Sequence, residues 1–230
     1  MILKPFEKLP PQFQNDDVRY YYDLLSTKRA SLIFKRIADF VLALVMTLVL
    51  IIPMAVIALI IKLSSTGPVF YKQERVTTYG EKFMILKFRT MKVGSDKAGL
   101  LTLENDDRIT GIGKVLRKLR LDELPQIFHV LTGKMSIVGT RPEVQKYVEQ
   151  YTPAMYATLL MPAGITSFAS IEYKDEDKII GEATSADMVD EIYISKILPD
   201  KMKYNLKYIE DFSFFYDIKL MFKTVMRVIF

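Results

Sequence analysis

The sequence contains no cysteine and only one histidine, His129. The absence of cysteine excludes disulfides, cysteine-ligated zinc, iron–sulfur clusters and thiol nucleophiles. With a single histidine, a histidine-rich metal site is excluded as well. Any chemistry must therefore use carboxylates, amines, guanidinium groups and hydroxyls. His129 could share a helix face with Asp122, but a structural role is the favoured interpretation for it.

Hydrophobicity and positive charge are combined in this chain. Half of the 230 residues are apolar, yet lysine and arginine number 32 against 27 aspartates and glutamates, which gives a net charge of +5. The 14 phenylalanines and 13 tyrosines exclude an intrinsically disordered chain. The length fits one globular domain with an appendage. Nucleic-acid binding is a weak alternative, because anionic lipid headgroups and phosphorylated substrates explain the charge more simply.

A membrane segment is predicted between Phe40 and Ile61, where no residue is charged and Thr47 has the only polar side chain. As a continuous helix this run would reach ~33 Å, close to the thickness of the hydrocarbon core. A buried helix of a soluble core is the alternative. A cleaved signal peptide fits less well, because the run begins about forty residues into the chain and no small-residue cleavage site follows it.

Basic residues flank the apolar run on both sides, which indicates that both flanks are cytoplasmic. A hairpin that enters and leaves by one leaflet satisfies both flanks, whereas a single crossing does not. Pro53 lacks an N–H and opposes the carbonyl of Val49, so we expect a kink near Ile52 and Pro53. We therefore predict a re-entrant helix over residues 35–63, broken at Pro53. The flanking cations are Lys28, Arg29, Lys35 and Arg36 before the run, and Lys62, Lys72, Arg75, Lys82, Lys87, Arg89 and Lys92 after it.

The rest of the chain predicts short elements of both kinds. Residues 1–34 suggest an irregular or interfacial lead-in. Strands are expected over residues 69–75, 82–91 and 136–138, a helix in the second half of 117–130, and a largely helical stretch over 143–160. The polar stretch from Gly94 to Asp107 is expected to form a loop near the active face.

The C-terminal residues 217–230 predict an amphipathic helix. Lys219, Lys223 and Arg227 recur at four-residue spacing, and large apolar residues occupy most of the remaining circumference. Such a helix could lie in a membrane interface, or it could pack on the domain with a solvated basic stripe. The pattern favours neither alternative.

Asp122 and Glu123 are the most suggestive pair for chemistry. They lie between the cations Arg117 and Arg120 and the proline at 125, which is tolerated only in the first turn of a helix. A helix should therefore begin near Asp122, where its dipole and the cations keep the carboxylates ionised. An ionised aspartate can attack phosphorus, and its neighbour can hold Mg²⁺. Taken alone, the fragment favours Asp122 as an ordinary N-cap.

Other cations could bind phosphate. Arg141, held stiffly by Pro142, can fork onto phosphate oxygens or form a surface ion pair. Lys87 and Arg89 place two cations on a predicted strand, where solvated edge charges are the alternative. The glycines before Lys114 resemble a phosphate loop, but Val115 stands where serine or threonine is required.

Taken together, these segments resemble the bacterial sugar transferases called monotopic phosphoglycosyl transferases, the undecaprenyl-phosphate glycosyl-1-phosphate transferases. The resemblance covers about residues 34–170 and stops short of the C-terminal part. It is carried by Lys35-Arg36 with Asp39, GPVFYKQERV from Gly67, KFRTM from Lys87, RLDELPQIFHVLTGKMSIVGTRPE from Arg120 and PAGIT from Pro162.

The resemblance implies an enzyme on the cytoplasmic face of the bacterial inner membrane. It would use Mg²⁺ to move a sugar-1-phosphate from a UDP-sugar to undecaprenyl phosphate, which starts surface-glycan assembly. Asp122 matches the nucleophile that forms a covalent aspartyl-phosphosugar and expels UMP. Glu123 matches its metal-holding partner, so both carboxylates are candidate metal ligands.

The same resemblance assigns the cations. Arg117 and Arg141 match phosphate-contacting arginines, and Lys87 and Arg89 match a basic pair that faces the same site. The sequence departs from the family pattern at Ile52, where a serine often precedes the proline, and after Pro162, where the family's late arginine has no clear counterpart. The stretch after Ser170 resembles compact members without extra N-terminal membrane spans.

We therefore predict a helix-dominated α+β protein. A lead-in (1–34) and a re-entrant membrane helix (35–63) would precede a small cytoplasmic-face catalytic domain (64–200) and a C-terminal amphipathic interfacial segment (201–230). The expected partners are a UDP-sugar, undecaprenyl phosphate and membrane lipid, with no nucleic acid; a homodimer is one alternative for the assembly. The alternative function is a non-catalytic membrane anchor that recruits glycan-assembly enzymes.

Overall fold

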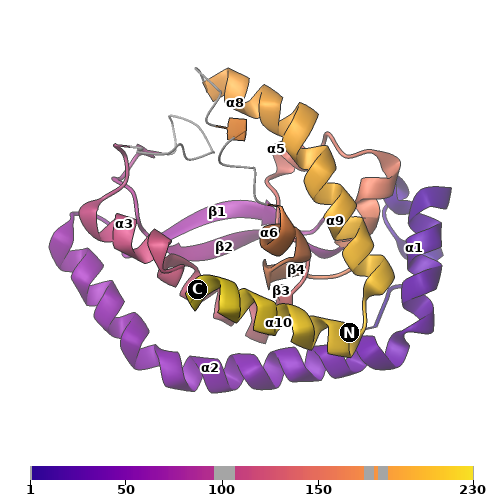
Figure 1. The fold of residues 1–230 in the computed structure, drawn as a ribbon, viewed down its shortest axis with the longest axis horizontal. Coiled ribbons are helices and arrows are strands. Elements are labelled where there is room, and N and C mark those ends of the chain that lie inside the picture. The colour runs from indigo at the N-terminus through magenta and orange to yellow at the C-terminus, as the bar shows by residue number, and fades with distance from the viewer. Residues whose placement is uncertain (1, 96–106, 174–178, 181–185, 230) are drawn as a thin grey trace.

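The computed structural model describes residues 2–95, 107–173, 179–180 and 186–229. Helices dominate these residues, and two small two-stranded sheets lie among them (Figure 1). The predicted helix-dominated α+β class is confirmed. Most of the polar stretch from Gly94 to Asp107 lies outside the described residues.

The N-terminal region contributes to the main hydrophobic core. Two short 3₁₀ turns, Phe6–Lys8 and Pro11–Phe13, lead into helix α1 (Asp16–Thr27). Asn15 caps this helix, because its side chain accepts a hydrogen bond from the N–H of Val18. Phe13 and Leu25 are fully buried in the same core as Tyr147. Within the lead-in that the sequence suggested to be irregular or interfacial, residues 16–27 are therefore helical and packed on the core.

Helix α2 (Arg29–Ser64) runs without interruption through Pro53. The predicted break at Ile52 and Pro53 into two helices of a hairpin is not seen. A proline removes one backbone hydrogen bond, and a helix can absorb that loss by bending instead of ending. Figure 1 shows α2 as an arc that follows one side of the molecule.

The two sides of α2 have different surroundings. One side packs on the rest of the protein through buried residues at helical spacing: Leu32, Lys35, Asp39, Ala43, Met54 and Ile61. The other side leaves large apolar side chains exposed, among them Leu48, Val49, Ile52 and Leu63. By length and composition α2 could cross a membrane, and only 11% of its most apolar stretch is buried inside the protein. An exposed apolar surface of this length is typical of a membrane contact.

The two sheets hold the centre of the molecule. Strands β1 (Phe70–Val76) and β2 (Lys82–Phe88) form an antiparallel hairpin. Strands β3 (Met135–Val138) and β4 (Ala163–Thr166) are parallel. Gly164 of β4 lies close to Gly139, which follows β3, because a Cβ on Gly164 would lie 2.2 Å from the nitrogen of Gly139. The predicted strand positions agree with β1, β2 and β3 to within a few residues.

Short helical segments connect the sheets. Helix α3 (Gly111–Lys118) begins at Thr110, whose side chain accepts from the N–H of Gly113. The 3₁₀ segment η5 (Leu121–Gln126) and helix α4 (Ile127–Leu131) follow it, where a helix was predicted. The helix expected over 143–160 is divided into α5 (Gln145–Val148) and the 3₁₀ segment η6 (Pro153–Leu159), which begins at Pro153. Proline is well tolerated at the first position of a helical segment, because its missing N–H would have no partner there.

The C-terminal region is helical from Ala186 onward. After α6 (Phe168–Glu172), helix α8 (Ala186–Ile192) continues through a π-helical turn (Tyr193–Ile197) into α9 (Leu198–Asp211), which packs in the main core. Helix α10 (Phe214–Ile229) then turns back to contact α2, α6 and β3. Its first half is held by buried Asp217 and Leu220, while Phe222 is 70% exposed.

Candidate active site

The carboxylate pair lies on η5, directly after a backbone turn at Arg120. Arg120 has a φ of 56°, in the left-handed region, and this turn separates α3 from η5. No side chain caps the start of η5, so the N-cap interpretation of Asp122 is not supported. Asp122 is instead buried, with 8% of its surface exposed. A buried aspartate that does not cap a helix requires another explanation.

Two cationic side chains contact the same carboxylate oxygen of Glu123. Lys87 of β2 donates to Glu123 Oε1 at 2.8 Å, and the Arg141 guanidinium donates to the same atom, also at 2.8 Å. Arg141 follows β3, so this contact joins the antiparallel hairpin to the parallel sheet. Only 11% of the Glu123 side chain is exposed, so these contacts are partly shielded from water.

The cations set the ionisation of the two carboxylates. Burial alone would raise the pKa of Glu123, but Arg141 and Lys87 outweigh it and hold that pKa well below its usual range. Burial and the neighbouring charge of Glu123 raise the pKa of Asp122, while Lys87 and Arg117 oppose the rise. Burial also lowers the pKa of Lys87, and Glu123 offsets part of that change. The pKa values of these two adjacent carboxylates are thus shifted in opposite directions, which is typical of reactive sites.

Arg117 comes to the same cluster from α3. Its Nε donates to the hydroxyl of Thr90 at 2.9 Å, which fixes the side chain beside the end of β2. The close packing of α3 on this segment depends on Gly113, where a Cβ would lie 2.1 Å from the carbonyl oxygen of Thr90. The structure therefore brings Asp122, Glu123, Lys87, Arg117 and Arg141 close together.

The Arg89 guanidinium contacts oxygens at the end of α2. It donates to the carbonyl of Thr66, and to the carbonyl and hydroxyl oxygens of Ser65 at 3.0 and 2.9 Å. These contacts tie β2 to the end of α2. No contact of Arg89 with the carboxylate pair is seen among the described residues.

Two residues near the cluster were not singled out from the sequence. Thr90 orients Arg117, and Arg75 of β1 donates to the carbonyl of Pro142 at 3.4 Å, next to Arg141. Burial lowers the pKa of Arg75, and the charge of Arg141 lowers it further. Both residues lie within the motifs that carried the resemblance. Only the resemblance could have indicated from the sequence that they lie near the site.

His129 has a structural role, as the sequence favoured. Its Nε2 accepts a hydrogen bond from the N–H of Leu86 at 3.1 Å, and its ring lies edge-on to Phe83. Burial and the charge of Lys134 lower its pKa, which favours the neutral ring that can accept this bond.

The carboxylate pair is compatible with Mg²⁺. Within the described residues no group of three or more histidine, cysteine, aspartate or glutamate side chains could enclose a metal. Mg²⁺ does not need such a cage, because it takes one or two carboxylates and completes its shell with water and substrate phosphates. Asp122 and the second oxygen of Glu123 could supply those carboxylates.

Comparison with known proteins identifies the family. The family model for bacterial sugar transferases matches residues 30–230. The chain belongs to the bacterial sugar transferase family. It is 37% identical over 199 residues to the UDP-glucose:undecaprenyl-phosphate glucose-1-phosphate transferase of Escherichia coli (strain K12), and the match covers 85% of this chain and 40% of that protein.

Two further relatives show the range of the family. The UDP-N-acetylgalactosamine-undecaprenyl-phosphate N-acetylgalactosaminephosphotransferase of Aeromonas hydrophila is 37% identical over 177 residues, 75% of this chain and 38% of that protein. The exopolysaccharide production protein ExoY of Sinorhizobium fredii (strain NBRC 101917 / NGR234) is 30% identical over 213 residues, 85% of each chain. The chain spans about two fifths of the length of the first two relatives. The matched region contains α2 from its second residue onward and the whole carboxylate–cation cluster.

Proposed function

We propose that the protein is a phosphoglycosyl transferase that moves a sugar-1-phosphate from a UDP-sugar to undecaprenyl phosphate. The observation that carries the proposal is the buried Asp122–Glu123 pair, surrounded by Lys87, Arg117 and Arg141, within the region matched by the family. Two relatives named for this reaction support the choice of donor and acceptor. Phosphoryl transfer depends mainly on positioning and on neutralising charge, and this cluster offers both.

In the proposed reaction Asp122 attacks the phosphorus that carries the sugar. The bond from that phosphorus to the bridging oxygen breaks, UMP leaves with the bond's electrons, and a sugar-phosphoryl-aspartate remains. An oxygen of the lipid phosphate then attacks the same phosphorus and releases the Asp122 carboxylate. Lys87 and Arg141 hold Glu123 ionised, and Arg117 and Arg141 contact phosphate oxygens. Arg89 supports the site from the end of α2.

Asp122 and Glu123 would hold Mg²⁺ together with the donor diphosphate. The ion would supply neutralisation of the charge that builds up on the phosphate oxygens. Glu123 keeps one oxygen for this role, because both of its cationic partners contact Oε1.

We also propose that the protein is monotopic, on the cytoplasmic face of the bacterial inner membrane. Near the start of α2, Arg36 donates to the carbonyls of Val130 and Leu131 at 2.7 and 3.1 Å, and at its end Ser65 and Thr66 accept from Arg89. Both ends are therefore fastened to one globular body. Because that body packs along one side of α2, a full crossing would draw its polar groups into hydrocarbon.

Turnover tests the catalytic proposal. Purified full-length protein with Mg²⁺, undecaprenyl phosphate and either UDP-glucose or UDP-N-acetylgalactosamine should release UMP. Asp122→Asn should abolish the release, whereas Asp16→Asn, which removes an exposed carboxylate at the start of α1, should not. Absence of UMP from a broad panel of UDP-sugars, or undiminished release by Asp122→Asn, would refute the proposal.

The covalent step needs its own measurement. With a donor labelled at the sugar-linked phosphorus and no lipid acceptor, protein-bound label should appear in the wild type and be absent from Asp122→Asn. The non-catalytic anchor predicts the opposite pattern: no label, and unchanged glycan assembly in cells that carry Asp122→Asn.

The absence of cysteine makes the topology directly testable. Single cysteines at Ser31 and Ser65 would lie on either side of the apolar run from Phe40 to Ile61. Both should react with a membrane-impermeant maleimide only when the cytoplasmic side is accessible. Labelling from opposite sides would contradict the monotopic arrangement.

A further inference from the structure

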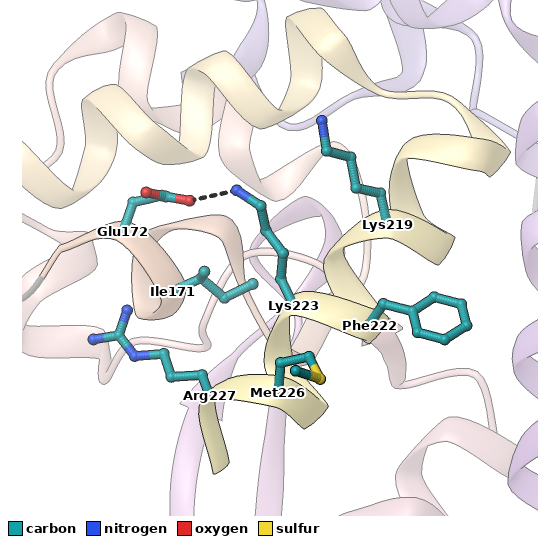
Figure 2. A pocket seen from close by; sticks show the side chains of 7 residues that line it. All are labelled: Ile171, Glu172, Lys219, Phe222, Lys223, Met226 and Arg227. Atoms are coloured by element: carbon teal, nitrogen blue, oxygen red, sulfur yellow. Dashed lines mark hydrogen bonds and ion pairs between the residues drawn. The ribbon is translucent and has the colours of Figure 1, made fainter. Parts of the chain in front are cut away.

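Helices α6 and α10 enclose an open groove of about 660 Å³ that contains none of the active-site residues. Its polar lining consists of three cations and one carboxylate: Lys219, Lys223, Arg227 and Glu172. Lys223 donates to Glu172 at 2.9 Å, which leaves a net positive charge on the remaining two cations. Within the described chain, neither Lys219 nor Arg227 has an acidic partner. Figure 2 shows Lys223 and Glu172 reaching toward each other, with Arg227 on the other side of Ile171.

Apolar side chains lie beside these cations. Phe222 and Met226 line the groove and are 70% and 55% exposed. At 100° per residue, α10 has three distinct sides. One side is buried at Asp217 and Leu220, a second carries the three cations, and a third exposes Phe215, Phe222, Val225 and Met226.

The exposed apolar side of α10 continues the exposed apolar side of α2. Phe34 of α2, which is 59% exposed, contacts Phe214 of α10, with ring centroids 6.4 Å apart. Phe214 in turn contacts Phe215, with centroids 5.8 Å apart. A bilayer that covers the outer side of α2 would therefore reach α10, and would place the adjacent cations at the level of the lipid headgroups.

We infer that this groove binds the phosphate-bearing headgroup of an anionic phospholipid. Lys219 and Arg227 contact the phosphate, Glu172 orients Lys223, and Phe222 and Met226 pack on the acyl chains. A soluble anion would explain the cations but not the exposed apolar residues beside them. A zwitterionic lipid would explain the apolar residues but not the excess of positive charge. The inference rests on the proposed membrane association.

Native mass spectrometry of the delipidated full-length protein in detergent tests the assignment. Dioleoyl-phosphatidylglycerol should bind at least tenfold more tightly than dioleoyl-phosphatidylcholine. The double variant Lys219→Gln, Arg227→Gln should weaken binding of the anionic lipid about 30-fold, which corresponds to two cations at about 1 kcal/mol each. The matched control Lys8→Gln, Lys196→Gln removes two exposed cations elsewhere and should change the affinity less than twofold.

A variant that preserves the charge distinguishes a loss of positive charge from a folding defect. Lys219→Arg with Arg227→Lys should keep the preference for the anionic lipid. Equal affinity for the two lipids, or an unchanged affinity in the double glutamine variant, would overturn the assignment. So would tighter binding of undecaprenyl phosphate at these residues, which would indicate an acceptor site, or displacement of the lipid by millimolar inorganic phosphate, which would indicate a site for soluble anions.

UMP release, measured on the same samples, separates this assignment from the proposed reaction. Lipid preference without UMP release would refute the enzyme and leave the headgroup site standing. UMP release without lipid preference would refute the headgroup site alone.

Discussion

Lys35 Nζ lies 2.5 Å from Asp217 Oδ2, although the two residues are 182 positions apart in the chain. The same nitrogen donates to the carbonyl of Val138 at 2.8 Å and lies 3.6 Å from Asp39. These contacts join α2, the end of β3 and α10 in one buried polar network. Because the chain passes from Val138 to Arg141 within three residues, the network also supports the position of an active-site cation.

Removing the cation of this network should cost much of the protein's stability. Lys35→Met leaves Asp217 and Asp39 buried without their cation, which is expected to lower the free energy of unfolding by about 3 to 5 kcal/mol. Lys207→Met is the control, because its pair with Asp211 is exposed and should be worth less than about 1 kcal/mol. Denaturant unfolding in detergent, followed by circular dichroism, measures both. Similar losses in the two variants would contradict the importance of the network.

The acid limb of the pH–rate profile should report Asp122. Its carboxylate must be ionised to attack phosphorus, so kcat/KM should fall as the pH drops through its pKa. Burial and Glu123 raise that pKa, and Lys87 lowers it. Lys87→Met should therefore move the acid limb to higher pH, whereas Lys8→Met should leave it in place. A limb that stays fixed or moves to lower pH in Lys87→Met would exclude Asp122 as its origin.

Glu123 should stabilise the fold only while it is ionised. Its folded-state pKa is held below the ordinary value of 4.5, so its contribution is complete above that pH and is lost as the pH falls toward the folded-state pKa. Glu123→Gln should lower the free energy of unfolding by about 3 kcal/mol at pH 7, because Lys87 and Arg141 lose their counter-charge.

The difference between wild type and Glu123→Gln should shrink below about pH 4.5. Glu149→Gln is the control, since Glu149 is exposed and contacts only Gln145 among the described residues. Unfolding curves at several pH values measure both variants. A difference that grows on acidification would have the wrong sign for this assignment.

The contact between β3 and β4 should not tolerate a side chain at Gly164. A Cβ there would lie 2.2 Å from the nitrogen of Gly139 and 2.4 Å from the carbonyl oxygen of Thr166, so the strands must separate. Gly164→Ala is expected to destabilise the fold by about 2 kcal/mol or more. It should also lower turnover, because Arg141 follows β3. Gly111→Ala meets no atom within 4 Å and should leave stability and turnover almost unchanged.

Local sequence was sufficient for several features. The charge-free run from Phe40 to Ile61 predicts a long helix because periodicity and hydrophobicity are properties of adjacent residues. Alternation of apolar and polar residues located β1 and β2. Asp122 and Glu123 were recognisable as a candidate site because they are neighbours in the chain, and the ordered motifs around them indicated the family that the comparison confirmed.

Tertiary structure decided what those residues contact. Whether Asp122 caps a helix or lies buried beside cations depends on the left-handed turn at Arg120, which the sequence does not reveal. Lys87 and Arg89 are two residues apart, yet only Lys87 contacts Glu123, because Arg89 is held by the end of α2. The sequence also does not decide what happens at Pro53, because the loss of one backbone hydrogen bond permits either a break or a bend of the helix. In the structure α2 continues through Pro53 and follows the globular body as an arc (Figure 1). Sequence patterns report on neighbours in the chain, whereas these outcomes depend on contacts between distant segments.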